Sequence, residues 1–191
     1  MAAQTASSSS AATPAGSRPA STAVRWDAFL AFFAAVVLIQ GIHVFEHIVQ
    51  LIQVYVLGVP DDRALGLLGY VLQLQGTEEW LHLGFNSAYL LALYLLVIPL
   101  IRVRGTEVPG WAVVTFVAGV VLESWHVVEH GVIISHVIAN HGCPCPGIGD
   151  AATGLSDTVL HFFYNALAYT AAVVPFWFLV RRRLPSSVVA G

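Results

Sequence analysis

The chain has 191 residues, of which 57% are hydrophobic and 10% are charged, and its mean hydropathy is +0.76. A soluble domain carries about 25% charged residues, so this composition excludes the soluble globular class and indicates an integral membrane protein. The net charge of −3 and the lack of a basic stripe exclude a nucleic acid partner. The two cysteines form a single Cys-Pro-Cys unit, which excludes a disulfide framework.

Four long apolar segments follow an N-terminal tail. Residues 1–25 are mainly Ala, Ser, Thr and Pro, which predicts a disordered cytoplasmic tail. About 20 apolar residues cross a hydrocarbon core of about 30 Å. The expected spans are 26–57, 78–101, 110–138 and 157–180, in one membrane domain at 26–183, with a second cytoplasmic tail at 184–191. The predicted fold class is an all-α integral membrane protein, a four-transmembrane-helix bundle.

The arginines set the expected orientation. Two precede the first span, two lie between the second and third spans, three follow the fourth span, and only Arg63 lies elsewhere. By the positive-inside rule, the N- and C-termini are cytoplasmic and the loops at about 58–77 and 139–156 face outward. The first of these loops is expected to hold a short interfacial helix from Asp61 to Gln75. We therefore expect a multi-pass protein of the bacterial plasma membrane.

Two copies of the string His-Val-x-Glu-His lie inside the first and third spans. The first copy runs from His43 to His47 and the second from His126 to His130. Charged side chains at membrane depth cost about 2.5–3.5 kcal/mol each on insertion, so they usually mark function. Because positions i and i+4 share one face of a helix, the two histidines of each copy are neighbours.

The second and fourth spans carry a matching pair of polar residues. An offset of 79 aligns His82 with His161 and Asn86 with Asn165, and an offset of 83 aligns the two histidine strings. Because rare residue types coincide, we predict a tandem parallel duplication of a helical hairpin, with a pseudo-two-fold axis along the membrane normal. The alternative is a duplicated hairpin whose polar residues only join helices, at about 0.6 kcal/mol for each hydrogen bond. The predicted repeats are residues 26–104 and 109–183.

Helix lengths place these polar side chains at similar depths in the outer half of the membrane, where we expect a metal centre. Neutral imidazole suits Zn, Cu, Fe and Ni, and six histidines from four helices predict two transition-metal ions, Cu or Fe ahead of Zn. Glu46 and Glu129 are expected to be catalytic, moving protons or completing the metal coordination. Gln40 and Glu123 are expected to support the ligands. The expected ligands are His43, His47, His82, His126, His130 and His161, with Asn86 and Asn165 as weak or water-bridged ligands.

The second outward loop holds a weaker candidate for metal capture. A Cys-Pro-Cys unit with nearby histidines suits a soft ion such as Cu(I). The alternative is a tight loop whose cysteines are oxidised or have no metal role. The residues concerned are His136, His141, Cys143 and Cys145.

The string His-x-x-Glu-His resembles the inverted-zincin motif of zinc peptidases, in which the histidines bind zinc and the glutamate is the general base. The resemblance implies these roles for His43, His47 and Glu46, and again for the second copy, but it covers five residues each time and the soluble fold of that family is absent. The paired histidines also resemble those of membrane di-iron hydroxylases and desaturases, which activate O₂. That second resemblance is one of ligand type and not of spacing.

Three functions fit these residues. A metal-dependent oxidoreductase of the monooxygenase type would use O₂ on a small or lipid-soluble substrate, with membrane lipid around it and an electron-donor protein as partner. A haem b electron-transfer protein needs one histidine from each of two helices, which leaves the other histidines and both glutamates without a role. A metal carrier or sensor would bind without catalysis. We expect the oxidoreductase.

Overall fold

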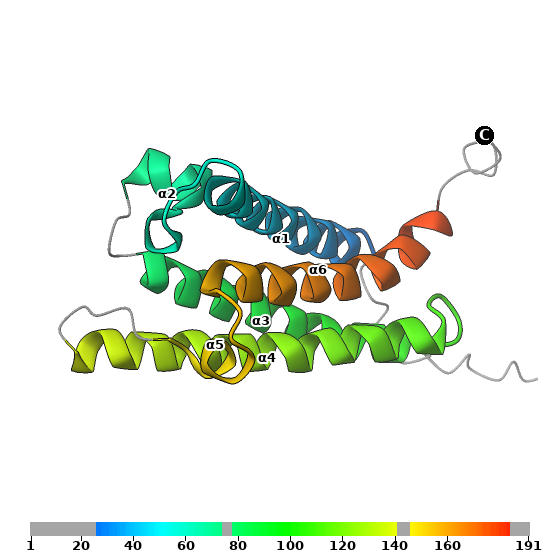
Figure 1. Cartoon of the computed structure of the whole chain (residues 1–191). Coiled ribbons are helices and arrows are strands. Elements are labelled where there is room, and N and C mark those ends of the chain that lie inside the picture. Colours follow the sequence, from blue (N-terminus) through cyan, green and yellow to red (C-terminus); the bar gives the residue numbers. More distant parts are fainter. Residues whose placement is uncertain (1–25, 74–77, 141–145, 184–191) are drawn as a thin grey trace, which may run out of the picture.

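The computed structural model describes residues 26–73, 78–140 and 146–183. Over these residues the protein is all-helical. The long helices are α1 (Trp26–Tyr55), α3 (Glu78–Arg102), α4 (Gly110–Ala139) and α6 (Asp157–Arg181). Three short helices lie in the two loops at one end of the bundle (Figure 1), namely η1 (Asp61–Arg63), α2 (Gly66–Leu72) and α5 (Ile148–Thr153).

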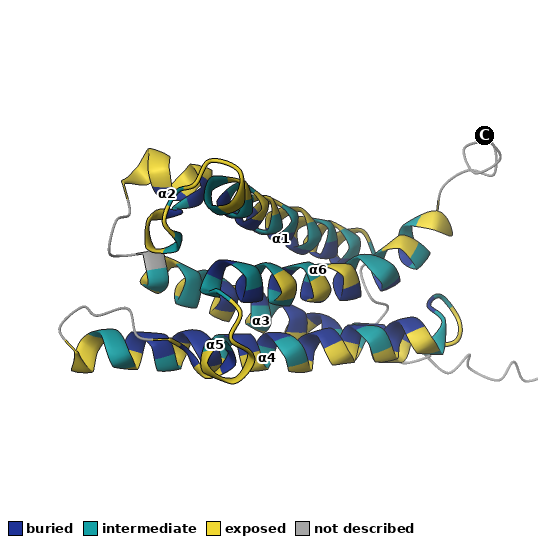
Figure 2. Cartoon of the chain, viewed as in Figure 1, coloured by how far each residue is buried: buried dark blue, intermediate teal, exposed yellow. Residues whose placement is uncertain are grey.

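All four long helices are long and apolar enough to cross a membrane, and their ends differ from the expected ones by at most two residues. Their outward faces are exposed and apolar, as in Leu38 and Val121, which are each 66% exposed. Figure 2 shows these exposed faces alternating with buried ones along each helix. An apolar surface of this extent suits lipid and not water. The expected all-helical fold with four apolar spans is confirmed, while the tandem duplication stays a prediction.

The four long helices form a ring in the order α1, α6, α4 and α3. α4 packs closely against both α3 and α6, and α1 packs against α6. α1 and α3 touch at fewer positions, so the ring is least tightly closed between them. The two loops with short helices cover the end where α1 and α4 finish (Figure 1).

The interior changes from apolar to polar along the bundle. Near the start of α1 and α4 the core consists of tightly packed side chains such as Phe33, Phe116 and Leu96, all at most 1% exposed. Towards the end with the loops, buried polar side chains replace them, beginning with Gln40 and Glu123. The apolar part provides packing, because it has no polar group to satisfy. The polar part needs a further explanation, because burying polar groups is costly.

The two loops that carry the short helices differ from expectation in two ways. The single interfacial helix expected from Asp61 to Gln75 is two short helices, because Gly66 at the start of α2 has φ +71°, a left-handed conformation that favours glycine. α5 was not expected at all. His141, Cys143 and Cys145 lie outside the described residues, so the capture loop stays a prediction.

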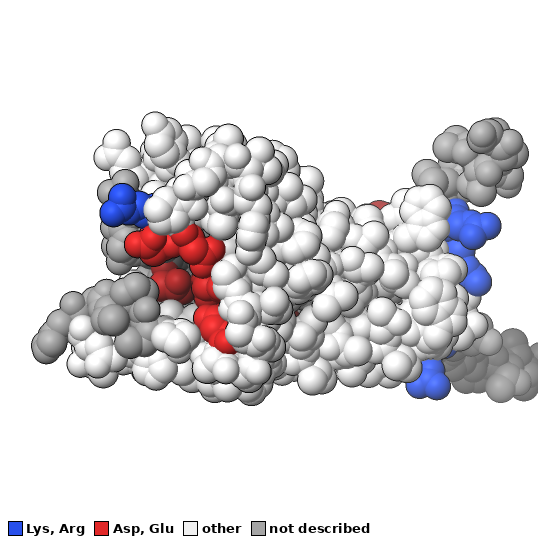
Figure 3. All heavy atoms as spheres, in the orientation of Figure 1, with Lys and Arg blue, Asp and Glu red and all other residues white. Residues whose placement is uncertain are grey.

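Charged side chains separate between the two ends of the molecule. Figure 3 shows acidic side chains gathered in a hollow at the end with the short helices, and basic side chains mainly at the opposite end. Arg102 and Arg181 end α3 and α6 there, and the guanidinium of Arg183 lies 4.3 Å from the ring centre of Trp26. Arg182 also donates a hydrogen bond to the carbonyl of Thr106.

Candidate metal centre

Six histidine rings from the four long helices contact one another in a single cluster. The ring centroids of neighbours are 4.4–5.8 Å apart. Five of the six side chains are buried, and the ring of His82 is half-buried. The rings come from His43 and His47 in α1, His82 in α3, His126 and His130 in α4, and His161 in α6.

The C-terminal triad, which we define as His126, His130 and His161, is the tighter half of this cluster. One nitrogen of each ring lies within 4.8 Å of the others, and the rings are at most 2% exposed. The Nε2 atoms of His126 and His130 are 3.1 Å apart. Two nitrogens bound to one ion at about 2.0–2.1 Å lie about 3 Å apart, so this pair has the spacing of two ligands of one metal ion.

Each ring of the C-terminal triad has a carboxylate at its Nδ1 atom. A metal-bound histidine usually gives its other ring N–H to a carboxylate, which fixes the tautomer and the orientation of the ring. The Nε2 atoms then remain available as ligands, and Nε2 of His161 has no hydrogen-bond partner among the described residues. The pairs are Glu123 with His126 at 3.4 Å, Glu79 with His130 at 3.3 Å and Asp157 with His161 at 2.9 Å.

The N-terminal triad, which we define as His43, His47 and His82, is more open. Its ring centroids are 4.8, 5.8 and 5.5 Å apart. Nε2 of His47 lies 3.0 Å from the side-chain nitrogen of Asn165, so that imidazole nitrogen already has a partner. Nε2 of His43 has none within the described part of the chain. Metal binding here requires the rings to move closer together.

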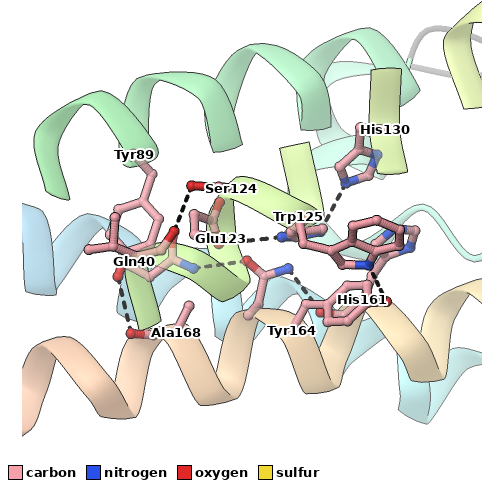
Figure 4. Close-up of polar contacts among 12 residues, drawn as sticks. Gln40, Tyr89, Glu123, Ser124, Trp125, His130, His161, Tyr164 and Ala168 are labelled. Atoms are coloured by element: carbon pink, nitrogen blue, oxygen red, sulfur yellow. Dashed lines mark hydrogen bonds and ion pairs between the residues drawn. The ribbon is translucent and has the colours of Figure 1, made fainter. Parts of the chain in front are cut away.

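The amide side chains predicted as weak ligands lie beside the histidines. Asn165 bridges three groups: its oxygen accepts a hydrogen bond from Gln40 at 2.8 Å, and its nitrogen donates to the carbonyl of His161 at 2.9 Å and faces His47. Figure 4 shows Gln40 and Glu123 within this polar interior. The amide of Asn86 is fully buried, and neither of its polar atoms is hydrogen-bonded among the described residues. Asn165 thus positions His47, and the ligand roles of both asparagines stay predictions.

The glutamates of the two histidine strings reach the loops that carry the short helices. The Oε2 atom of Glu46 accepts hydrogen bonds from the backbone N–H groups of Leu67 and Leu68 at 2.6 and 2.9 Å, at the start of α2. The Oε1 atom of Glu129 accepts one from Gly149 at 2.7 Å, at the start of α5. The first N–H groups of a helix have no partner inside it and favour a carboxylate. Both glutamates therefore anchor a short helix, and their catalytic role stays a prediction.

Glycines allow this close approach of the loops. A Cβ atom on Gly66 would lie 2.6 Å from Oε2 of Glu46, and one on Gly147 would lie 2.0 Å from Oε1 of Glu129. Both distances are too short for non-bonded atoms, so a side chain at either glycine would push the carboxylate away. In both loops, therefore, a glycine lies against the carboxylate of the glutamate that anchors the loop.

Sequence reasoning missed two of the three carboxylates that hold the C-terminal triad. Asp157 lies four residues before His161, and this i, i+4 spacing was a usable signal. Glu79 reaches His130 from a different helix, so no local spacing predicts that contact. His136, at the end of α4, belongs to neither of the two close ligand groups found among the described residues.

A cavity of about 760 Å³ connects the loop end of the bundle with the histidines. His47, His82 and His161 are among its lining residues. Burial and the nearby Asp157 carboxylate raise the pKa of Asp150, a lining residue in α5. The hollow in Figure 3 carries acidic side chains in the same place. The acidic lining residues are Asp61, Asp62, Glu79, Asp150 and Asp157.

Comparisons of the chain with protein-family models, with curated proteins and with solved structures find no match.

Proposed function

We propose that this protein is a membrane metalloprotein whose two histidine triads hold two transition-metal ions, Cu or Fe ahead of Zn. The observation that carries the proposal is the C-terminal triad: three buried imidazoles with ligand atoms within 4.8 Å of one another, each with a carboxylate at Nδ1. Burying polar side chains without a bonding partner is costly. A metal ion bound by the imidazole nitrogens would supply that partner.

The internal repeat supports a second ion. Each residue of the C-terminal triad aligns with one of the N-terminal triad, at an offset of 83 for the two pairs in α1 and α4 and of 79 for the pair in α3 and α6. The shared anchoring role of Glu46 and Glu129 follows the same alignment. We infer a tandem duplication with a pseudo-two-fold axis along the membrane normal, and hence two similar metal positions.

The proposed reaction is a metal-dependent, monooxygenase-like oxidation of a small or lipid-soluble substrate by O₂, with electrons from a partner protein. Copper or iron would supply the electrons that O₂ accepts. The Nε2 atoms of the C-terminal triad would bind one ion, and the three carboxylates would orient those rings. In the N-terminal triad, Nε2 of His43 and Nδ1 of His47 are the buried ring nitrogens without a hydrogen-bond partner among the described residues, and they would bind the second ion. The cavity admits a small substrate, while the loosely closed side between α1 and α3 faces membrane lipid.

The charge separation in Figure 3 supports the proposed orientation. Arginines follow α3 and α6 at one end, and by the positive-inside rule that end and both termini are cytoplasmic. The acid-lined cavity then opens outward, and the centre lies in the outer half of a bacterial plasma membrane.

Two alternatives predict different contents of the site. Haem b needs space for a porphyrin between its two axial histidines, and ring contacts of 4.4–5.8 Å favour ion-sized ligands instead. A metal carrier or sensor has one specific observation in its favour, namely the acidic lining of the cavity, which suits metal delivery as well as catalysis.

The test is to purify the full chain in detergent, measure its metals by mass spectrometry and record absorption and O₂ consumption. We expect about two Cu or Fe ions per chain, no Soret band, and O₂ consumption once a chemical reductant is added. A Soret band would assign the histidines to haem. Bound metal without any O₂ reactivity would support the carrier, and a chain that binds no added metal would overturn the proposal.

A further inference from the structure

We propose that Glu79, His82 and His130 form a loading site, where a divalent transition-metal ion binds before it passes to the triads. The inference rests on the proposed function, since it needs the triads as destinations. One ligand atom of each of the three residues lies within 4.8 Å of the others. A carboxylate with two imidazoles is a donor set that suits Fe²⁺, Cu²⁺ and Zn²⁺.

His130 belongs to both sites through its two ring nitrogens. Its Nδ1 atom lies 3.3 Å from Oε2 of Glu79, and its Nε2 atom lies 3.1 Å from Nε2 of His126. Both distances match the spacing of about 3 Å expected for two ligands of one ion. Binding an ion at Glu79 and Nδ1 requires the tautomer of His130 whose ring proton is on Nε2. Passage of the ion to the C-terminal triad, across a single imidazole ring, then moves that proton to Nδ1. The ring of His82 contacts the ring of His47, with centroids 5.5 Å apart, which connects the loading site to the N-terminal triad.

The loading site faces the cavity, whose lining attracts cations. Glu79 and His82 line the cavity together with four aspartates, and the lining formed by the described residues contains no arginine. A cleft that carries one sign of charge between low-dielectric walls concentrates counter-ions and speeds their association. Divalent ions fit this surface better than Cu(I), which prefers sulfur ligands.

A second observation shows that ligands lie deeper than the acidic lining. The ring of His161 is 2% exposed and lines the cavity, and its Nε2 atom has no hydrogen-bond partner among the residues that the structure describes. The donor set thus changes along the route, from carboxylates at the mouth, through one carboxylate and two imidazoles, to three imidazoles. For borderline ions such as Fe²⁺ and Cu²⁺ this order favours movement inward.

The experiment measures how fast the metal-free full chain, in detergent, takes up Co²⁺, whose visible absorption reports nitrogen and oxygen ligands. For Glu79→Gln we expect uptake at least about tenfold slower. Saturating Co²⁺ should still fill the same number of sites per chain, although at lower affinity, because Glu79 also orients His130 in the C-terminal triad. Added salt should slow the wild type and have less effect on the variant, because screening weakens the attraction of the lining. Asp62→Asn, at the exposed mouth, should slow uptake by about twofold or less, as expected for one screened surface charge.

The matched control is Glu123→Gln. Glu123 faces Nδ1 of His126 as Glu79 faces Nδ1 of His130, but it does not line the cavity. Its loss should weaken final Co²⁺ binding without slowing uptake, which separates loading from support of a ligand. Glu79→Asp keeps the charge and should restore much of the rate, which guards against a folding defect in Glu79→Gln.

The outcomes distinguish the two proposals. Uptake by Glu79→Gln at the wild-type rate would overturn the loading site and leave the metal centre intact. Uptake slowed as much in Glu123→Gln as in Glu79→Gln would also overturn it, because the rate would then report support of a ligand and not a loading site. A wild-type chain that takes up no Co²⁺, Cu²⁺ or Fe²⁺ would overturn the proposed function itself.

Discussion

The two histidine triads have the same residue types and the same helical spacing but differ in how closely they assemble. Within α1 and within α4 the paired rings are equally close, with centroids 4.8 Å apart in each case. The two triads differ in the position of the third ring, which is His161 in one and His82 in the other. His161 lies 4.4 and 5.1 Å from its partners, whereas His82 lies 5.5 and 5.8 Å from its own. Local spacing fixes the pair, and the packing of a second helix decides whether the third ligand completes it.

Small residues explain the tighter packing of the second half. A Cβ atom on Gly119 of α4 would lie 2.5 Å from the Cβ atom of Ala171 on α6, so only glycine allows the two helices to approach this closely. In the predicted alignment, Val36 takes the place of Gly119, and Tyr89 takes the place of Ala168. Both larger side chains are buried. The hydroxyl of Tyr89 donates a hydrogen bond to the carbonyl of Ala168 on α6 at 3.4 Å, and α1 and α3 touch at fewer positions than α4 and α6.

The largest effect should follow from removing aligned ligands. We expect His126→Ala to abolish stoichiometric binding of one ion and to weaken affinity by more than the 10–100-fold typical of residues that only support a ligand. His43→Ala, the aligned change in the N-terminal triad, should cost less, because that triad is less preformed. Metal titration of both variants checks the order. An equal or larger loss in His43→Ala would show that the more open geometry has no energetic consequence.

The carboxylates of the C-terminal triad come next. Asp157→Asn and Glu123→Gln should each lower metal affinity about 10–100-fold, because they release the orientation of a ligating ring. Asn165→Ala removes the corresponding support of His47 and should affect the other ion. Competition with a chelator of known affinity measures each loss. If Asp157→Asn and Asn165→Ala weakened the same ion, the assignment of supports to separate triads would be wrong.

Exchanging the aligned residues Gly119 and Val36 tests whether helix packing causes the difference in compactness between the two triads. Gly119→Val places the residue of the first half into the second, and overpacking at this contact should cost about 1–3 kcal/mol of stability. It should also move α6 outward and weaken the C-terminal triad. The reverse change, Val36→Gly, is the control and should leave that triad intact. Thermal unfolding in detergent and metal titration give the two readouts. Unchanged metal affinity in Gly119→Val would separate helix packing from ligand geometry.

The sequence could predict features that depend on local spacing within a helix, but not those that depend on packing between helices. The four spans were predictable because apolar runs of that length have few other uses, and the histidine pairs because i, i+4 neighbours share a face. The contact of Glu79 with His130 was not predictable, since it joins two helices whose relative rotation depends on packing. The anchoring of α2 and α5 by Glu46 and Glu129 was missed because a glutamate beside two histidines also fits a metal site.

The anchoring of α2 by Glu46 and of α5 by Glu129 allows a comparison of smaller effects. Glu46→Gln and Glu129→Gln keep the size of the side chain but weaken its hydrogen bonds to a helix start, a change expected to cost about 0.5–2 kcal/mol by analogy with helix caps. We expect local loosening of α2 in the first variant and of α5 in the second, measured by amide hydrogen exchange. The metal content should persist in both. Loss of metal with unchanged amide hydrogen exchange would show that these glutamates act at the metal centre and not as anchors of the loop helices.

The smallest effect concerns a charge that α5 carries and α2 lacks. α5 contains Asp150, whereas α2 contains no acidic residue. Burial and Asp157 raise the pKa of Asp150 in the folded protein, so its ionisation costs stability, and the cost appears as the pH rises through that raised pKa. Asp150→Asn should therefore stabilise the protein near neutral pH and give no gain in acid, where the carboxyl group of the wild type is already protonated.

Because Asp150 is only partly buried, solvent screens this effect, and we expect less than about 1 kcal/mol. Unfolding temperatures of Asp150→Asn and wild type, compared at acidic and at neutral pH in the absence of metal, measure it. With Co²⁺ present the sign should reverse, since the ion then favours the ionised carboxylate at the cavity mouth. A variant that is less stable at neutral pH without metal would show that the hydrogen bond from the backbone N–H of Gly147 to Asp150 outweighs the cost of its charge.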